Sequence, residues 1–146
     1  MLHVISNHES GTALADRRSF ERMDVIHTAL WVSDLERTRE FYVDALGLTE
    51  NWSFTADDGV ENVYVGGENA EFQFKYDPDG GPKIDPGTMA HVAVGVESTD
   101  ETFERLSERA DPPVHEEPTT MEKIDRRVAF VEDPDGYVVE LVERLE

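Results

Sequence analysis

The chain has 146 residues, and its 33 acidic and 13 basic side chains give a formal net charge of −20. Such a field repels nucleic acid and anionic membranes, so neither is an expected partner. The absence of cysteine excludes disulfides, thiolate metal ligands and a cysteine nucleophile. No apolar run reaches the roughly 18 residues of a membrane span, and the N-terminus lacks a secretory signal pattern. We therefore expect a cytoplasmic globular protein.

The acidic residues are spread along the chain and do not collect in a tail. Concentrated salt screens the repulsion between such charges. The composition therefore indicates a halophilic protein, and an ordinary acidic protein from a low-salt environment is the alternative.

Residues 1–22 have no periodic apolar pattern, and we expect a flexible leader with solvated His3 and His8 before a domain that begins at Met23. Capping boxes start at Ser33 and Ser98 and predict helices that end near residues 46 and 111. Alternating or continuous apolar runs predict strands. The expected strands are 25–32, 49–55, 60–66, 70–76, 89–96, 114–117, 127–132 and 137–142.

The order strand, helix, three strands therefore occurs twice. The first module spans 23–77, a Pro/Gly-rich connector spans 78–87, and the second module spans 88–146. A repeat on this scale implies two equivalent modules packed together. The prediction is an α+β fold of two tandem βαβββ modules whose curved mixed sheets enclose a site.

Each predicted module has one polar residue on its first strand and one on its last. These residues are His27 and Gln73 in the first module, and His91 and Glu140 in the second. Glu140 shares its strand face with valines, where a carboxylate is costly unless a cation or hydrogen bonds compensate it. By pseudo-symmetry, the four side chains should converge inside the curved sheets.

Two imidazoles, a carboxylate and an amide oxygen suit a divalent Ni, Co, Zn or Fe ion. A lone histidine on a strand is usually a core residue, but two at matching repeat positions favour a metal. Glu71 lies on the same strand face as Gln73 and is the alternative ligand, or lines a substrate pocket. Trp31 shares a face with His27 and either lines that pocket or fills the core, whereas His115 is expected at the surface.

Four stretches carry a resemblance to a known family. They are His27 to Leu30, Phe41-Tyr42 with Leu46-Gly47-Leu48, Met89 to Ala93, and Phe130 to Tyr137 followed by Glu140-Leu141. They resemble the vicinal oxygen chelate superfamily, and within it most closely glyoxalase I (lactoylglutathione lyase). The resemblance extends from about Met23 to Glu143.

That resemblance implies paired βαβββ modules, a divalent metal and a homodimer in which the site is often completed across the subunits. Bacterial-type enzymes often use Ni²⁺ or Co²⁺, and others use Zn²⁺. The family's ligand positions fall on His27, Gln73, His91 and Glu140. The chain departs from the family twice: Gln73 stands where glutamate is usual, and Trp31 replaces an arginine that helps to hold the glutathione carboxylate.

The implied function is methylglyoxal detoxification by a metal-dependent lyase. The substrate is a hemithioacetal of methylglyoxal and a small thiol, and Glu140 is the base that moves a proton from C1 to C2. One alternative is an extradiol-type dioxygenase that holds Fe(II) with His27, His91 and Glu140. Another is a non-catalytic binding or resistance protein of the same fold.

We predict that chloride salt stabilises the protein against heat. Raising the salt from about 0.1 M to about 1 M shortens the Debye length from about 10 Å to about 3 Å, which screens the repulsion between carboxylates. The melting temperature, followed by circular dichroism, should therefore rise with sodium or potassium chloride. A melting temperature that stays level or falls would contradict the halophilic interpretation.

Overall fold

The computed structural model describes residues 23–146, so the predicted leader with His3 and His8 lies outside the described residues. The described chain forms two compact units. One unit comprises residues 23–35 and 48–83, and the other comprises 36–47 and 84–146. No helix within residues 23–146 is long and apolar enough to cross a membrane.

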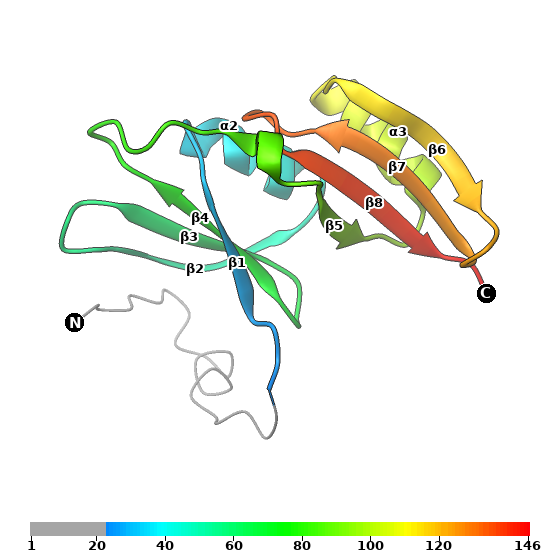
Figure 1. Cartoon of the computed structure of the whole chain (residues 1–146), viewed down its shortest axis with the longest axis horizontal. Helices are drawn as coiled ribbons and strands as arrows, with labels where there is room; N and C mark the ends of the chain where they lie inside the picture. The colour runs from blue at the N-terminus through cyan, green and yellow to red at the C-terminus, as the bar shows by residue number, and fades with distance from the viewer. Residues whose placement is uncertain (1–22) are drawn as a thin grey trace. The chain divides into compact units, whose positions relative to one another are not determined.

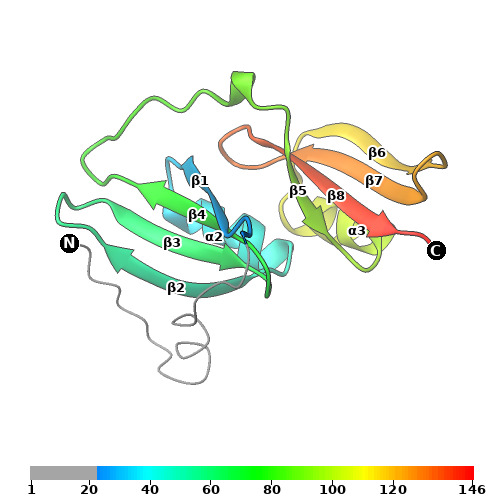
Figure 2. The ribbon, with the colours of Figure 1, turned by 60° about the horizontal axis from the view of Figure 1, so that its bottom comes forward.

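The first unit is a mixed four-stranded sheet. Its strands are β1 (His27–Trp31), β2 (Thr49–Thr55), β3 (Glu61–Gly66) and β4 (Glu71–Tyr76). They lie in the order β1-β4-β3-β2 (Figure 2). The first and last strands of the unit pair in parallel, and the other neighbours are antiparallel. One face of this sheet consists of buried apolar side chains, which are Leu30, Val63, Val65 and Phe74.

The second unit has a sheet of the same design. Its strands are β5 (Val92–Gly95), β6 (Val114–Met121), β7 (Arg126–Glu132) and β8 (Val138–Arg144), in the order β5-β8-β7-β6 (Figure 1). Here too the first and last strands are parallel. Helix α3 (Thr99–Arg109) packs against β6, β7 and β8 and buries Leu106. The 3-10 helix η2 (Pro86–Thr88) precedes β5. The predicted α+β fold with two βαβββ repeats is confirmed.

The helix predicted to end near residue 46 has two parts. It begins as the α-helix α2 (Leu35–Arg39) and continues as the π-helix η1 (Glu40–Ala45). Arg105 of α3 donates hydrogen bonds to the carbonyls of Ala45 at 2.8 Å and Leu46 at 3.0 Å, which satisfies groups that a helix end leaves free. The segment ends at Gly47, whose φ of 102° is typical of the glycine that follows a helix.

Two other elements differ most from their predicted bounds. Strand β6 continues to Met121 past Pro118, which is possible because β6 is the edge of its sheet and its pairing shifts between Glu116 and Thr119. Strand β5 starts at Val92, so His91 lies immediately before the strand and not within it.

The predicted hairpin turn between β7 and β8 is present, and it contains a buried carboxylate. Asp133 accepts hydrogen bonds from the Tyr42 hydroxyl at 2.6 Å and from the backbone N–H groups of Asp135 and Tyr137 at 2.8 and 3.0 Å. Burial raises the pKa of Asp133 above its usual value, and the hydrogen bond from Tyr42 opposes that rise. Burial also raises the pKa of Tyr42, so its hydroxyl stays protonated and donates.

We expect Tyr42→Phe to lower the free energy of unfolding by about 1–3 kcal/mol, because a buried acceptor loses its donor. The hydrogen bond lowers the pKa of Asp133 and therefore favours the charged carboxylate. Its contribution is present where Asp133 is ionised and shrinks as the pH falls through the pKa of Asp133. Denaturant unfolding should show a larger loss at neutral pH than at about pH 4.

Tyr76→Phe is the matched control, because the half-buried Tyr76 hydroxyl has no hydrogen bond to any residue within 23–146. Equal losses for both variants, or a loss at Tyr42 that does not change with pH, would contradict the assigned role.

Candidate functional site

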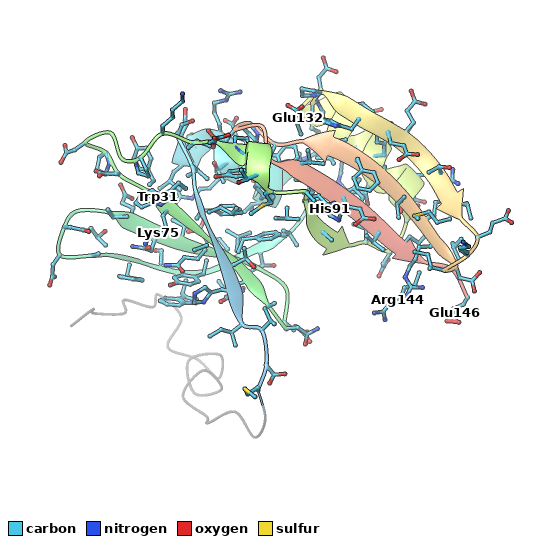
Figure 3. The ribbon with its side chains drawn as sticks, in the orientation of Figure 1. Trp31, Lys75, His91, Glu132, Arg144 and Glu146 are labelled. Carbon is cyan, nitrogen blue, oxygen red and sulfur yellow. The ribbon has the colours of Figure 1, made fainter. Side chains whose placement is uncertain are left out.

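In the second unit, the structure brings His91 and Glu140 into contact. The Nε2 atom of His91 lies 3.1 Å from Oε1 of Glu140. The parallel pairing of β5 with β8 aligns Ala93 with Glu140, so a residue just before β5 reaches the middle of β8 (Figure 3). Phe130 lies opposite Glu140 on β7, and its ring meets the His91 ring edge-on at 5.4 Å. His91 is therefore the polar partner that Glu140 requires among its valine neighbours.

In the first unit, His27 and Gln73 share one face of the sheet. Strands β1 and β4 are in parallel register, with His27 opposite Glu71 and Ala29 opposite Gln73. Side chains alternate along a strand, so His27, Glu71 and Gln73 point to the same side. Tyr64 lies opposite Gln73 on β3, and the His27 ring packs edge-on against it at 5.6 Å.

Gln73 and Glu71 are the two candidate ligands on this strand, and they differ in burial and in their hydrogen-bond partners. Gln73 is 9% exposed, and its amide nitrogen donates to Oδ1 of Asn62 at 2.9 Å. Within residues 23–146, no donor reaches its other polar atom, the carbonyl oxygen Oε1. The Glu71 carboxylate accepts through Oε2 from Nδ2 of Asn51 at 2.7 Å, and its Oε1 has no donor within residues 23–146. Gln73 is the more buried of the two residues, and its role as a metal ligand stays a prediction.

Aromatic rings extend this face of the first sheet. Trp52 stacks on Tyr64 with ring centroids 3.8 Å apart, and Phe54 lies beside both. Burial and, secondarily, the Glu71 carboxylate raise the pKa of Tyr64, so its hydroxyl stays protonated. The face therefore combines an apolar surface with a few polar atoms, as small-molecule sites do.

Trp31 lies at the other end of this face, directly opposite Lys75 (Figure 3). The Nζ atom of Lys75 is 5.4 Å from the centroid of the Trp31 ring, which is within the range of a cation–π interaction. Trp31 is half-buried and is not part of the fully buried core. A role for Trp31 or Glu71 in a substrate pocket stays a prediction.

A second histidine–carboxylate pair lies apart from the predicted set. His115 contacts Glu132 at 2.7 Å, and its side chain is 46% exposed, as expected for a surface residue. No three His, Asp or Glu side chains within the described part of the chain form a group that could hold a metal ion. The four predicted ligands occur as two pairs, one in each unit.

Three residues on the face of the first sheet were not singled out from the sequence. They are Asn62, which bonds to Gln73, Tyr64, which packs against His27, and Lys75, which bonds to Asn62. The detectable signal is a polar or amphipathic residue at every second position of two neighbouring strands. That signal becomes specific only when the pairing register of β3 with β4 is known.

The two pairs have distinct chemical capabilities. A carboxylate beside an imidazole can accept and return a proton, whereas the Gln73 amide cannot act as a base. The donor set of imidazole nitrogens and carboxylate and amide oxygens also suits first-row divalent ions. These residues therefore fit both a metal centre and a proton-transfer site.

Comparison with known proteins identifies the family of the chain. The family model "Glyoxalase/Bleomycin resistance protein/Dioxygenase superfamily" matches residues 24–141. A probable lactoylglutathione lyase of Synechocystis is 33% identical over 127 residues, which is 83% of this chain and 95% of that protein. A lactoylglutathione lyase of Haemophilus influenzae is also 33% identical, over 83% of this chain and 93% of its own.

Solved structures of this family have a similar fold. Glyoxalase I from Zea mays superposes with a TM-score of 0.75 at 25% identity, and the match covers 84% of this chain but only 45% of the maize chain. A trypanothione-dependent glyoxalase I of Leishmania major gives a TM-score of 0.69 at 26% identity, covering 84% of this chain and 87% of its own. An antibiotic-binding protein from Streptomyces, TnmS3, is 24% identical and shares the fold, with a TM-score of 0.66 over 86% of this chain and 99% of its own.

The family match over almost the whole described chain and the curated relatives lead to one assignment: this chain belongs to the glyoxalase/bleomycin resistance protein/dioxygenase superfamily.

Proposed function

We propose that this chain is a metal-dependent lyase of the glyoxalase I type. Its substrate is the hemithioacetal of methylglyoxal and a small thiol, and its product is a 2-hydroxyacyl thioester. The observation that carries the proposal is the contact between His91 and Glu140 at 3.1 Å, with His27 and Gln73 at the matching positions of the other repeat. The names of the curated relatives support the same activity.

The residues that would hold the metal are His27, Gln73, His91 and Glu140. The donor-free oxygen of Gln73 and the adjoining nitrogen and oxygen atoms of His91 and Glu140 support this choice. A bound divalent ion would supply Lewis acidity toward the two neighbouring oxygens of the substrate, which favours loss of the proton at C1. Because Gln73 is neutral, the set carries one carboxylate, and we expect weaker metal affinity but stronger Lewis acidity than with two.

Glu140 is the proposed base. Its carboxylate takes the proton from C1 as the C1–H bond breaks and returns it to C2 as the new C–H bond forms. The C1 hydroxyl loses its proton and becomes the thioester carbonyl, while the C2 carbonyl oxygen gains a proton and becomes the hydroxyl, so the reaction is an isomerisation without net oxidation or reduction. With only one carboxylate in the set, we expect one competent base and the use of one epimer of the hemithioacetal.

The identity of the thiol in the substrate follows less directly from the site than the identity of the base does. The curated relatives carry glutathione in their names, and the Leishmania neighbour is described as trypanothione-dependent, so proteins of this type differ in their thiol. Trp31 occupies the position where the family resemblance implies an arginine for the glutathione carboxylate. We therefore propose a low-molecular-weight thiol that does not depend on that arginine, and a homodimer as the working assembly.

The first experiment is metal analysis of the protein purified without added metal, followed by reconstitution with Ni²⁺, Co²⁺, Zn²⁺ or Fe²⁺. We expect about one ion bound per site and isomerase activity with Ni²⁺, Co²⁺ or Zn²⁺. Oxygen uptake with a catechol and Fe²⁺ alone would instead indicate an extradiol-type dioxygenase. Folded protein that binds no metal would contradict both enzymes and favour a binding protein.

We predict that Glu140→Gln lowers turnover by about 10²–10⁴-fold, the usual contribution of a general base. The variant should still bind metal, because an amide oxygen can replace a carboxylate oxygen as a ligand. Glu132→Gln is the matched control, since Glu132 also contacts a histidine on the same sheet but belongs to the surface pair. Full activity in Glu140→Gln, measured as thioester formation, would overturn the assignment of the base.

A further inference from the structure

The most buried polar side chain on the face of the first sheet is Asn62, which is 1% exposed. Its Oδ1 atom accepts from Nε2 of Gln73 at 2.9 Å and from Nζ of Lys75 at 2.7 Å. Its Nδ2 atom donates to the carbonyl of Val60 at 3.1 Å. Asn62 therefore joins a cation, a backbone carbonyl and the proposed ligand Gln73 in one chain of hydrogen bonds.

The direction of this chain follows from the chemistry of its two ends. A lysine ammonium has donors only, so the Asn62 atom that faces Lys75 must be the carbonyl oxygen. The Val60 carbonyl accepts only, so the atom that faces it must be the amide nitrogen. Turning the Asn62 amide over would set donor against donor at Lys75 and acceptor against acceptor at Val60. The orientation of Asn62 is fixed from both sides.

The orientation of Gln73 is fixed in turn. The only atom of Gln73 that can face the Asn62 oxygen at hydrogen-bond distance is its amide nitrogen. Its carbonyl oxygen must then point away from Asn62, and no donor within residues 23–146 reaches that oxygen. The Gln73 residue is only 9% exposed, and an acceptor there without a donor is costly, so the arrangement favours a partner that residues 23–146 do not supply.

We propose that Asn62 is a positioning residue that holds the Gln73 amide with its carbonyl oxygen toward the metal, and that Lys75 sets the direction of Asn62. This inference rests on the proposed function for the identity of the partner. It assigns roles to two residues outside the ligand set. It also explains how a neutral amide can serve as a ligand, because a freely rotating amide would present its NH₂ group to a cation in part of the population.

The charge of Lys75 supports its role as the residue that orients Asn62 in this series of hydrogen bonds. The protein has many more acidic than basic residues, yet no carboxylate among residues 23–146 lies within ion-pair distance of the Lys75 ammonium. The side chain instead lies over the Trp31 ring and bonds to the Asn62 oxygen. A hydrogen bond from a charged donor is stronger than a neutral one, so Lys75 determines which way Asn62 faces.

The test compares two substitutions at residue 62 by metal titration. Asn62→Leu removes the acceptor, and we expect a loss of metal affinity of about 10–100-fold, as is usual when the partner of a metal ligand is removed. Asn62→Asp keeps an acceptor for both Gln73 and Lys75 and loses only the donor to the Val60 carbonyl, so its affinity should be higher than that of Asn62→Leu. Affinity is read as the competition of the protein for Ni²⁺, Co²⁺ or Zn²⁺ against a chromogenic chelator.

A double-mutant cycle separates positioning from a merely structural role. Gln73→Ala removes the ligand, so adding Asn62→Leu should cause no further loss of affinity. The proposal is overturned if Asn62→Leu keeps native affinity, if it loses as much in the Gln73→Ala background, or if Asn62→Asp loses as much as Asn62→Leu. Melting temperatures of the metal-free variants check that each one folds.

A measurement on the native metal-free protein does not depend on either activity or variant folding. The Gln73 side-chain NH₂ signals in a ¹⁵N spectrum, assigned by their loss in Gln73→Ala, should exchange with water more slowly than those of exposed glutamines. Exchange at the rate of a free glutamine amide would overturn the proposal even if the enzyme is active. Slow exchange in a protein without lyase activity would support the positioning role while the proposed function fails.

Discussion

The parallel pairing of first and last strands is the constraint on which both halves of the candidate site depend. Parallel neighbours cannot be joined by a tight turn, so a long connection must lie between them, and in each repeat of this chain it contains a helix and two further strands. In this protein the constraint acts twice, through β1 with β4 and β5 with β8. It brings residues from opposite ends of each repeat onto one sheet face, which is why His91 meets Glu140 although they are far apart in the sequence.

Burying the polar residues on these faces costs folding free energy. Glu140 lies between valines and gains His91 as its partner, while Asn62 is almost fully buried and needs three hydrogen bonds. An apolar residue would be easier to accommodate at either position. The second unit also contains the buried contact between Tyr42 and Asp133, but there every oxygen of the carboxylate has a donor. Gln73 differs in that no donor within residues 23–146 reaches its carbonyl oxygen, and the proposed binding role rests on that difference.

Strand periodicity and the internal repeat were sufficient to predict much of this structure. Period-two alternation predicted that Glu71 and Gln73 share a strand face and that Glu140 lies among valines. The internal repeat matched the positions of the two histidines and predicted that they converge with Gln73 and Glu140, because both signals lie within the sequence itself. The change from α-helix to π-helix at Glu40 could not be predicted from the sequence, because it depends on contacts between distant segments, such as that of Arg105 with Ala45. The choice between Gln73 and Glu71 also required the partners of each side chain, and those depend on the register of β3 with β4 and on Asn51 of β2.

The neutrality of Gln73 and the charge of Lys75 belong together. A second carboxylate in the ligand set would attract the Lys75 ammonium directly, and the lysine would then compete with a metal ion for the same oxygens. With an amide at residue 73, the ammonium instead bonds to Asn62, and no donor within residues 23–146 reaches the Gln73 oxygen. The same amide leaves Glu140 as the one carboxylate of the proposed ligand set, so the identity of residue 73 bears on both the proposed ligand atom and the proposed base. The departure at residue 73 is therefore consistent with its surroundings, because Asn62 and Lys75 form the environment that an amide requires.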